Sequence, residues 1–306
     1  MRPLVSVIVP SYNQGRFLRA TLDSILEQDH RPLEILVMDG ASTDESVDVL
    51  RSYDAPELQW WSEPDRGVTD AVNKGLARAR GDIQAIQSSD DLYTPGAITA
   101  AVDAFARDGD LALVYGDVEY MDENANRIGG TSQPPFDFVV YLSKRIYVPQ
   151  PAAFFTKAAA QAAGPWRAEV SYAADAEFYL RIATNHRVAK IDRVLARYRF
   201  HEAQRDKASA KISRDWEKVV RDWLAVNEVS RDVRRKALAG VHLTRAHYLS
   251  DAQWAPRTAE LYRALLLDPT LVKHEHFPLR ELLPGRQPIW KILSRIKRAL
   301  GLSSRA

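Results

Sequence analysis

The chain has 306 residues, of which 46% are hydrophobic, so it is long enough to bury a full core. It contains no cysteine, which excludes disulfides and thiolate metal sites and leaves oxygen and imidazole groups as metal ligands. Residues 1–204 carry 21 Lys and Arg against 29 Asp and Glu, whereas residues 205–306 carry 21 against 11. This shift predicts an acidic domain over residues 1–205 and a basic extension over residues 206–306.

Apolar strands alternate with amphipathic helices in the first part of the chain. The pattern predicts strands at 4–9, 33–38, 58–61, 82–87 and 111–115, and helices at 16–27, 69–79 and 97–107. Residues 42–45, Ser-Thr-Asp-Glu, have the capping-box pattern that precedes a helix. Alternation of this kind predicts an α/β fold with a doubly wound, mostly parallel sheet. Beyond residue 205 we expect an α-helical extension, with helices at 208–226, 230–250 and 256–267.

Polar clusters follow four of the predicted strands. In doubly wound sheets, ligands bind outside the carboxyl ends of the strands, where loops leave toward the next helix. The clusters therefore predict one binding site at this edge, built from Pro10-Ser11-Tyr12-Asn13, Asp39-Gly40, Glu63-Pro64-Asp65 and Ser88-Ser89-Asp90-Asp91.

The adjacent carboxylates in Ser89-Asp90-Asp91 follow an apolar strand directly. One of them can hold a hard cation while the other binds ribose or orients the first. A lone Asp-Asp pair is also common in turns and helix caps. A sugar carried on a diphosphate leaves with two negative charges, which a Mg or Mn ion bridging the phosphate oxygens would stabilise.

Taken together, the motifs resemble those of the family 2 glycosyltransferases, inverting enzymes with the A-type glycosyltransferase fold. The resemblance covers about residues 4–201 and begins with residues 5–13 and 38–44. Its longest block, residues 62–75, is similar to the branch that builds bacterial surface polysaccharides. The resemblance implies an inverting, non-processive enzyme, because the membrane helices and the Gln-x-x-Arg-Trp motif of processive synthases are not found.

The resemblance also implies which residues bind the nucleotide-sugar donor. The loop after the first strand and Asp39 would surround the base, although an aspartate before a glycine also suits a turn. The block at 62–75 would line the nucleotide pocket, although Asn73 could be a packed polar residue and Lys74 a solvated charge. The expected donor contacts are Pro10, Ser11, Tyr12, Asp39, Asp65, Asp70, Asn73, Lys74, Ser89 and Asp90.

In motifs of this type the last carboxylate touches the metal. The resemblance therefore implies that Asp91 is the ligand of Mn or Mg and that Asp90 contacts the donor. A histidine after a late strand often completes the metal site in this fold, and His201 stands at that place; a surface or capping histidine is the alternative. Gln150 is a further candidate contact for donor or acceptor.

Inversion needs a base that removes the proton of the acceptor hydroxyl. The candidate is Asp175, in a segment similar to the family's Glu-Asp motif at a helix start, although Ala174 replaces the glutamate. Glu177 could act instead if the register is shifted by two residues. A helix N-cap aspartate is the structural alternative for Asp175.

We therefore predict a metal-dependent glycosyltransferase that uses a nucleoside-diphosphate sugar, with UDP as the expected nucleotide. Its acceptor would be a glycan or a lipid-linked glycan in cell-surface polysaccharide biosynthesis, with no nucleic acid as partner. Two other readings stay open. A sugar-nucleotide-forming nucleotidyltransferase has a related sheet but needs a glycine-rich, basic loop where this chain has Pro10-Ser11-Tyr12-Asn13. A catalytically dead scaffold would use its helical tail to bind a protein.

The chain's location follows from its apolar segments. The run at residues 4–9 is too short for a signal peptide, and no later run is long enough to cross a bilayer. The terminal segment 288–300 places apolar residues on one helical face and Lys and Arg on the other, which is typical of helices that lie on anionic membranes. Docking of this face on the protein is the alternative. We expect a cytoplasmic protein that can be peripheral on the inner face of the cytoplasmic membrane.

Overall fold

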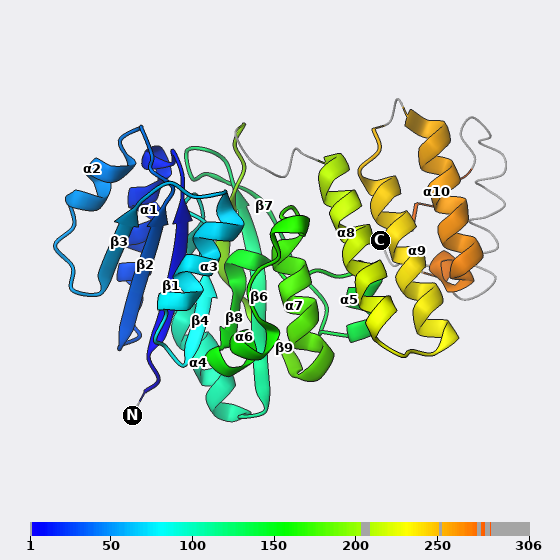
Figure 1. Cartoon of the computed structure of the whole chain (residues 1–306), viewed down its shortest axis with the longest axis horizontal. Helices are drawn as coiled ribbons and strands as arrows, with labels where there is room; N and C mark the ends of the chain where they lie inside the picture. The colour runs from blue at the N-terminus through cyan, green and yellow to red at the C-terminus, as the bar shows by residue number, and fades with distance from the viewer. Residues whose placement is uncertain (1, 203–208, 251–252, 274–276, 279–281, 283–306) are drawn as a thin grey trace. The chain divides into compact units, whose positions relative to one another are not determined.

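The computed structural model describes residues 2–202, 209–250, 253–273, 277–278 and 282. The chain divides into two compact units, residues 1–138 with 146–205 and residues 139–145 with 206–306 (Figure 1). The segment 139–145 thus belongs to the second unit although it precedes the predicted boundary at residue 205. The amphipathic segment 288–300 lies outside the described residues. Among the described helices, none is long and apolar enough to cross a membrane.

The first unit is a nine-stranded mixed sheet with helices on both faces (Figure 1). Its strand order is β3-β2-β1-β4-β8-β6-β9-β5, and β7 pairs with β6. Strands β1 to β4 pair in parallel, whereas β8 is antiparallel to both β4 and β6. The strands are β1 (Val5–Ser11), β2 (Leu33–Asp39), β3 (Leu58–Ser62), β4 (Ile83–Ile86), β5 (Leu92–Tyr93), β6 (Leu111–Met121), β7 (Arg127–Thr131), β8 (Ala153–Thr156) and β9 (Arg187–Arg199).

The predicted α/β class is confirmed, and the predicted helices of the first part form as α1, α3 and α4. The antiparallel pairings of the later strands are the feature that alternation did not predict. The helices of this unit are α1 (Gly15–Leu26), α2 (Ser46–Arg51), α3 (Val68–Arg78), α4 (Ala97–Arg107), α6 (Lys157–Ala163) and α7 (Ala174–Asn185), with 3-10 turns η1 (Gln150–Ala152) and η2 (Ala168–Val170).

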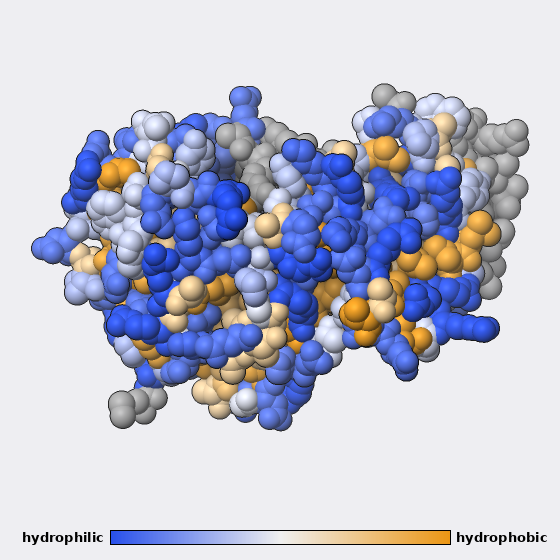
Figure 2. Space-filling view, viewed as in Figure 1, coloured by the Kyte–Doolittle hydropathy of each residue, from blue (hydrophilic) through white to orange (hydrophobic). Residues whose placement is uncertain are grey.

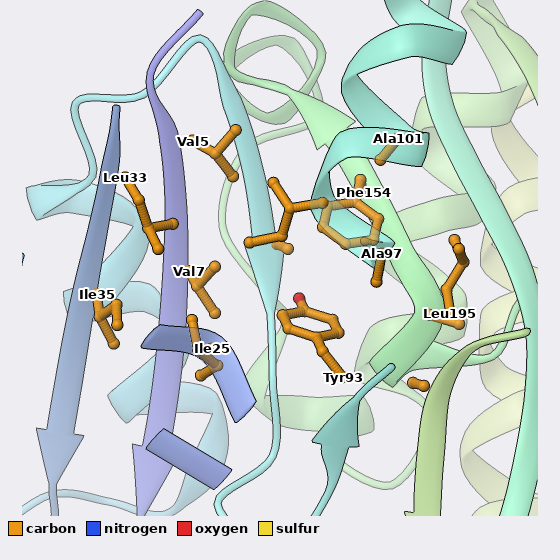
Figure 3. Close-up of a cluster of buried hydrophobic side chains, with 14 of the residues drawn as sticks. Val5, Val7, Ile25, Leu33, Ile35, Tyr93, Ala97, Ala101, Phe154 and Leu195 are labelled. Atoms are coloured by element: carbon orange, nitrogen blue, oxygen red, sulfur yellow. The ribbon is translucent and has the colours of Figure 1, made fainter. Parts of the chain in front are cut away.

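Side-chain alternation along the strands decides which helix covers which face. Val5 and Val7 of β1 and Phe154 of β8 point into the core shared with α1 and α4 (Figure 3). The next residue of β8, Phe155, packs instead against Phe178 of α7, with ring centroids 5.2 Å apart. Both faces of the sheet are therefore buried, and every residue of β1 and β2 is buried, most of them apolar.

The second unit is helical, as the sequence predicts. Its described helices are α8 (Ser209–Val226), α9 (Arg231–His247) and α10 (Trp254–Leu267), followed by η5 (Pro269–Lys273). Residues 139–142 of α5 (Phe138–Leu142) also belong to this unit. Gly240 of α9 packs on Ser143, because a Cβ at this position would lie 2.3 Å from the Ser143 carbonyl oxygen. On the face shown in Figure 2 this unit is largely hydrophilic with some hydrophobic areas, and Tyr262 and Leu266 of α10 are exposed.

A buried carboxylate lies within the sheet of the first unit. Glu34 of β2 accepts hydrogen bonds from Ser6 Oγ (2.5 Å), Arg80 N (2.6 Å) and Arg80 Nε (2.8 Å). Burial raises the pKa of Glu34, but the hydrogen bonds from Ser6 and Arg80 outweigh burial, so its pKa lies below the ordinary 4.5.

The sign of the resulting pH dependence follows from that lowered pKa. The stabilisation is complete above pH 4.5 and is lost as the pH falls through the folded-state pKa of Glu34. We expect Glu34→Gln to lower the free energy of unfolding at neutral pH by about 1–3 kcal/mol and to weaken its decline under acid. Urea unfolding at several pH values measures both; an unchanged acid slope would show that other carboxylates cause it.

Candidate active site

The parallel strands bring the predicted polar clusters together at one edge of the sheet. Ser11 pairs with Asp39 in the β1–β2 register, and Asp39 pairs with Ser62 in the β2–β3 register. The Gln87 backbone N–H, just after β4, donates to the Ile8 carbonyl (2.9 Å), so the loop at Ser88 leaves from the same edge. The edge is therefore the place where a ligand can meet all four clusters.

Asp39 is held in one orientation by hydrogen bonds. Its Oδ2 accepts from Ser42 N (2.9 Å) and Ser62 Oγ (2.6 Å), and its Oδ1 accepts from Ser42 Oγ (2.5 Å). The side chain of Ser42 is thus not a helix cap. The predicted capping box is wrong, because α2 begins only at Ser46, with Glu45 as its N-cap residue and no side-chain cap. The ordered carboxylate of Asp39 suits recognition of N–H donors.

The loop after β1 lies against the loop after β2. A Cβ at Gly40 would lie 2.7 Å from Asp65 Oδ2 and 3.3 Å from the Tyr12 ring, so only glycine leaves room for both side chains. The Tyr12 side chain is exposed, whereas Pro10 and Ser11 are buried. The Ser11 hydroxyl is buried and has no hydrogen-bond partner among the described residues.

A small hollow opens beside Asp39, lined by Met38, Asp39, Trp61, Glu63, Asp65, Ala71 and Lys74. Lys74 reaches it from α3 and is held by Glu63 Oε1 (3.0 Å), the Pro64 carbonyl (3.2 Å) and Asp70 Oδ2 (3.7 Å). Asp70 also accepts hydrogen bonds from Arg66, which lower the pKa of this carboxyl. Of the predicted pocket residues, Asp39, Asp65 and Lys74 therefore share one hollow.

Asn73 has a different set of contacts. Its Nδ2 donates to the Trp166 carbonyl (2.9 Å), and its Oδ1 accepts from the Trp166 backbone N–H (2.8 Å). This reciprocal pair joins α3 to the segment before η2 and satisfies the Asn73 amide inside the protein. Its assignment to the donor pocket stays a prediction.

The segment Ser88–Asp91 receives contacts from two later parts of the chain. Ser88 Oγ donates to Gln150 Oε1 (3.0 Å), and Gln150 Nε2 donates to the Ile86 carbonyl. Asp90 Oδ2 lies 2.8 Å from His201 Nε2, although 111 residues separate the two in sequence. Ser89 is buried.

Asp91 is more deeply enclosed than Asp90. It is 1% exposed, and its Oδ1 accepts from the Arg199 backbone N–H at 2.8 Å. The Asp91 N–H donates to the Ser88 carbonyl (3.1 Å), which closes a turn. Asp91 therefore fastens the end of β9 to this turn, while Asp90 carries the carboxylate that meets the imidazole.

The donor set of Asp90 and His201 fits a divalent cation. Carboxylate oxygen and imidazole nitrogen are ligands that Mn accepts, and both side chains are largely buried, at 16% and 4% exposure. Among the described residues there is no cluster of three or more His, Asp or Glu that could form a complete metal cage. Two protein ligands suit an ion whose other positions are filled by substrate phosphates and water.

Arg199 is a residue at this site that the sequence analysis did not single out. It is 2% exposed and its Nε donates to the Asp90 carbonyl at 2.7 Å. Burial lowers the pKa of its guanidinium, and the charges of Asp90 and Asp91 oppose that shift. The only signal for Arg199 in the sequence is that it lies two residues before His201.

The two candidate bases lie on α7 and differ in their surroundings. The helix begins at Ala174 with Ala173 as N-cap residue, so Asp175 lies within the first turn and is not the N-cap. Glu177 is buried and makes a two-pronged pair with Arg181, with Nε and Nη2 both at 2.8 Å, and Arg167 lies 3.6 Å away. The Glu177 carboxylate is therefore buried and forms ion pairs with two arginines, whereas Asp175 is half-buried.

We expect Glu177→Gln to lower the free energy of unfolding by about 1.5–3 kcal/mol, because charge-assisted hydrogen bonds to Arg181 are weakened. Transfer activity below the melting temperature should remain within about threefold of wild type. Denaturant unfolding and an activity assay on the same preparation measure both effects. Loss of activity with unchanged stability would make Glu177 the base.

Comparison with known proteins identifies the family of this chain. The family model for glycosyl transferase family 2 matches residues 6–160, just over half of the chain. The chain belongs to glycosyl transferase family 2. The matched residues include every predicted donor contact, whereas Asp175 and His201 lie beyond them.

Relatives of this family 2 chain include bacterial glycosyltransferases. An uncharacterized glycosyltransferase of Mycobacterium tuberculosis is 33% identical over 183 residues, 59% of this chain and 69% of that protein. A PGL/p-HBAD biosynthesis glycosyltransferase of Mycobacterium bovis is 34% identical over 188 residues, covering 60% and 71%. The chondroitin synthase of Escherichia coli is 26% identical over 186 residues, but the match spans only 26% of that protein.

Solved structures confirm the A-type glycosyltransferase fold. A mannosyltransferase from Pyrobaculum calidifontis, in complex with GDP-Man and Mn2+, superposes with a TM-score of 0.64 at 23% identity, over 99% of this chain and 82% of that one. TarS 1–349 of S. aureus in complex with UDP-GlcNAc gives a TM-score of 0.62 at 15% identity, over 88% and 82%.

Proposed function

We propose that this chain transfers a sugar from a nucleoside-diphosphate sugar to an acceptor hydroxyl, with inversion and without processive elongation. The observation that carries the proposal is the 2.8 Å contact between Asp90 and His201 at the sheet edge where Asp39 also lies. The similarity to structures that hold GDP-Man with Mn2+ and UDP-GlcNAc supports a nucleotide sugar as donor. UDP is the nucleotide we propose.

The donor pocket in this proposal extends along the carboxyl ends of β1 to β4. Asp39 accepts an N–H of the base, while Ser11 and Tyr12 flank it. Asp65 and Lys74, together with Pro10, Asp70, Asn73 and Ser89, complete the nucleotide side. The support is the shared hollow of Asp39, Asp65 and Lys74 and the buried, unpartnered hydroxyl of Ser11.

For the metal we propose Asp90 and His201 as the protein ligands. This assignment reverses the roles that the sequence suggests for Asp90 and Asp91. It is supported by the enclosed position of Asp91, which binds the Arg199 N–H. When bound, Mn or Mg would offset the negative charge of the departing diphosphate.

The chemical step assigns Asp175 as general base. The acceptor oxygen forms a bond to the anomeric carbon, the bond from that carbon to the diphosphate oxygen breaks, and the acceptor proton passes to the Asp175 carboxylate. Attack on the face opposite the diphosphate inverts the anomeric configuration. The half-buried position of Asp175, beside the fully engaged Glu177, supports this choice.

For the acceptor we propose a glycan or lipid-linked glycan of the bacterial cell surface. The names of two relatives, PGL/p-HBAD biosynthesis glycosyltransferase and chondroitin synthase, are in keeping with such acceptors. We place the enzyme in the cytoplasm, with the segment 288–300 as its contact to an anionic membrane. The family assignment leaves the nucleotidyltransferase and scaffold alternatives without a supporting observation.

Thermal-shift screening against nucleoside diphosphates and their sugars, with and without Mn2+, tests the proposal. We expect UDP or a UDP-sugar to raise the melting temperature, and Mn2+ to enlarge the shift. No shift with any nucleotide would contradict the proposed donor site. A shift without any effect of Mn2+ would contradict the metal site alone.

A further inference from the structure

Arg199 connects three segments that meet beside the metal candidates. Its Nε donates to the Asp90 carbonyl (2.7 Å), and its Nη1 donates to the carbonyls of Glu123 (2.9 Å) and Asp122 (3.3 Å). The two latter carbonyls belong to the turn between β6 and β7, which Asp122 closes through its own contacts to Asn126. A guanidinium can make these bonds together because its donors are fixed in one plane.

The backbone of Arg199 adds a contact to the other carboxylate. Its N–H donates to Asp91 Oδ1 at 2.8 Å. Arg199 therefore binds the main chain of Asp90 through its side chain and the side chain of Asp91 through its main chain. Because Arg199 and His201 are two residues apart, these bonds also fix where the imidazole enters the site.

Phe17 of α1 supports the same arrangement from a third direction. The Arg199 guanidinium carbon lies 4.7 Å from the centroid of the Phe17 ring, and the His201 ring lies 5.0 Å from it. Phe17 is 6% exposed, so both contacts are shielded from water. The ring thus restricts the guanidinium and the imidazole together.

We propose that Arg199 is a positioning residue for the metal site: it holds Asp90 and His201 at the separation that binds a divalent cation. This inference rests on the proposed function, since it assumes the Asp90–His201 metal site. The carboxylates of Asp90 and Asp91 lie beside the guanidinium, although the positive charges of Arg197 and Arg16 also act on it. A lysine could not replace it, since one ammonium cannot match the planar fork that joins Asp90 to the turn at Asp122.

Mn2+ titration of the full chain by electron paramagnetic resonance, with UDP present, tests the proposal. Arg199→Lys keeps the positive charge but loses the planar set of guanidinium N–H donors. We expect its Mn2+ affinity to fall about 10- to 100-fold, as for other residues that orient metal ligands. Arg197→Lys is the matched control. Arg197 lies on the same strand and donates to the Ala125 carbonyl of the same turn (2.7 Å), so its Mn2+ affinity should stay within about threefold of wild type.

The outcomes separate this inference from the proposed function. Wild-type affinity in a folded Arg199→Lys variant would overturn the positioning role while leaving the metal site intact. If that variant does not fold, Phe17→Leu decides, since it should also weaken Mn2+ binding; an unchanged affinity would overturn the role. No Mn2+ binding by wild type would overturn the metal site and this inference together.

Discussion

Asp175→Asn should abolish sugar transfer while leaving donor binding intact. General-base catalysis typically contributes 10²- to 10⁴-fold, so we expect kcat to fall by about that factor. The amide keeps the shape of the carboxylate but accepts no proton from the acceptor hydroxyl. Asp175 is not the N-cap of α7, so the change removes no cap. Rates of nucleoside diphosphate release and calorimetric donor affinities are the two quantities to measure.

Glu177→Gln is the matched control for this variant, because it removes a carboxylate two residues away on the same helix. It should lower stability and keep activity, which is the reverse of the Asp175→Asn result. Loss of donor binding in Asp175→Asn would instead indicate that Asp175 has a structural role. Equal loss of activity in both variants would not distinguish the two carboxylates and would contradict our assignment of Asp175 as the base.

The second large effect separates Asp90 from Asp91. Asp90→Ala removes the carboxylate beside His201, and we expect Mn2+ affinity to fall by about 100-fold or more. This exceeds the loss of about 10- to 100-fold that is typical when a residue that only orients a metal ligand is changed. Asp91→Asn keeps a carbonyl oxygen that can still accept from the Arg199 N–H, so Mn2+ affinity should fall by less than about 10-fold. Isothermal titration with Mn2+ and UDP measures both.

The pair of variants also tests the reading that the sequence alone suggests. If Asp91→Asn lost the metal while Asp90→Ala retained it, Asp91 would be the ligand and the contact between Asp90 and His201 would be structural. His201→Ala should lower Mn2+ affinity as Asp90→Ala does, because the two side chains lie 2.8 Å apart. A melting temperature within a few degrees of wild type is the control for each variant.

The fold of the first unit could be predicted largely from local patterns. Strands β1 and β2 are short and mostly apolar, and the helix between them, α1, has one apolar face, so periodicity located these elements within a few residues. The carboxyl ends of β1, β2 and β4 also located Ser11, Asp39 and Asp90 at one edge. The pairing of β8 with β4 and β6 involves residues far apart in sequence, and nothing local in Ala153–Thr156 specifies it.

The division of roles within the site depends on contacts between distant segments. Asp90 and Asp91 are neighbours in sequence, and only the docking of Arg199 and His201, more than 100 residues later, makes them different. The same holds for Asn73, whose partner Trp166 is 93 residues away. The Glu177–Arg181 pair did have a local signal, because residues four apart on a helix lie side by side.

Phosphorus NMR of the full chain with a UDP-sugar panel, a glycan acceptor and Mn2+ tests the central claim most directly. We predict that one donor is consumed with release of UDP, and that the signal for UDP fails to accumulate with Asp90→Ala. Release of sugar 1-phosphate in place of UDP would contradict glycosyl transfer and indicate chemistry at phosphorus. Donor consumption that Asp90→Ala leaves unchanged would contradict the site on which the proposal depends.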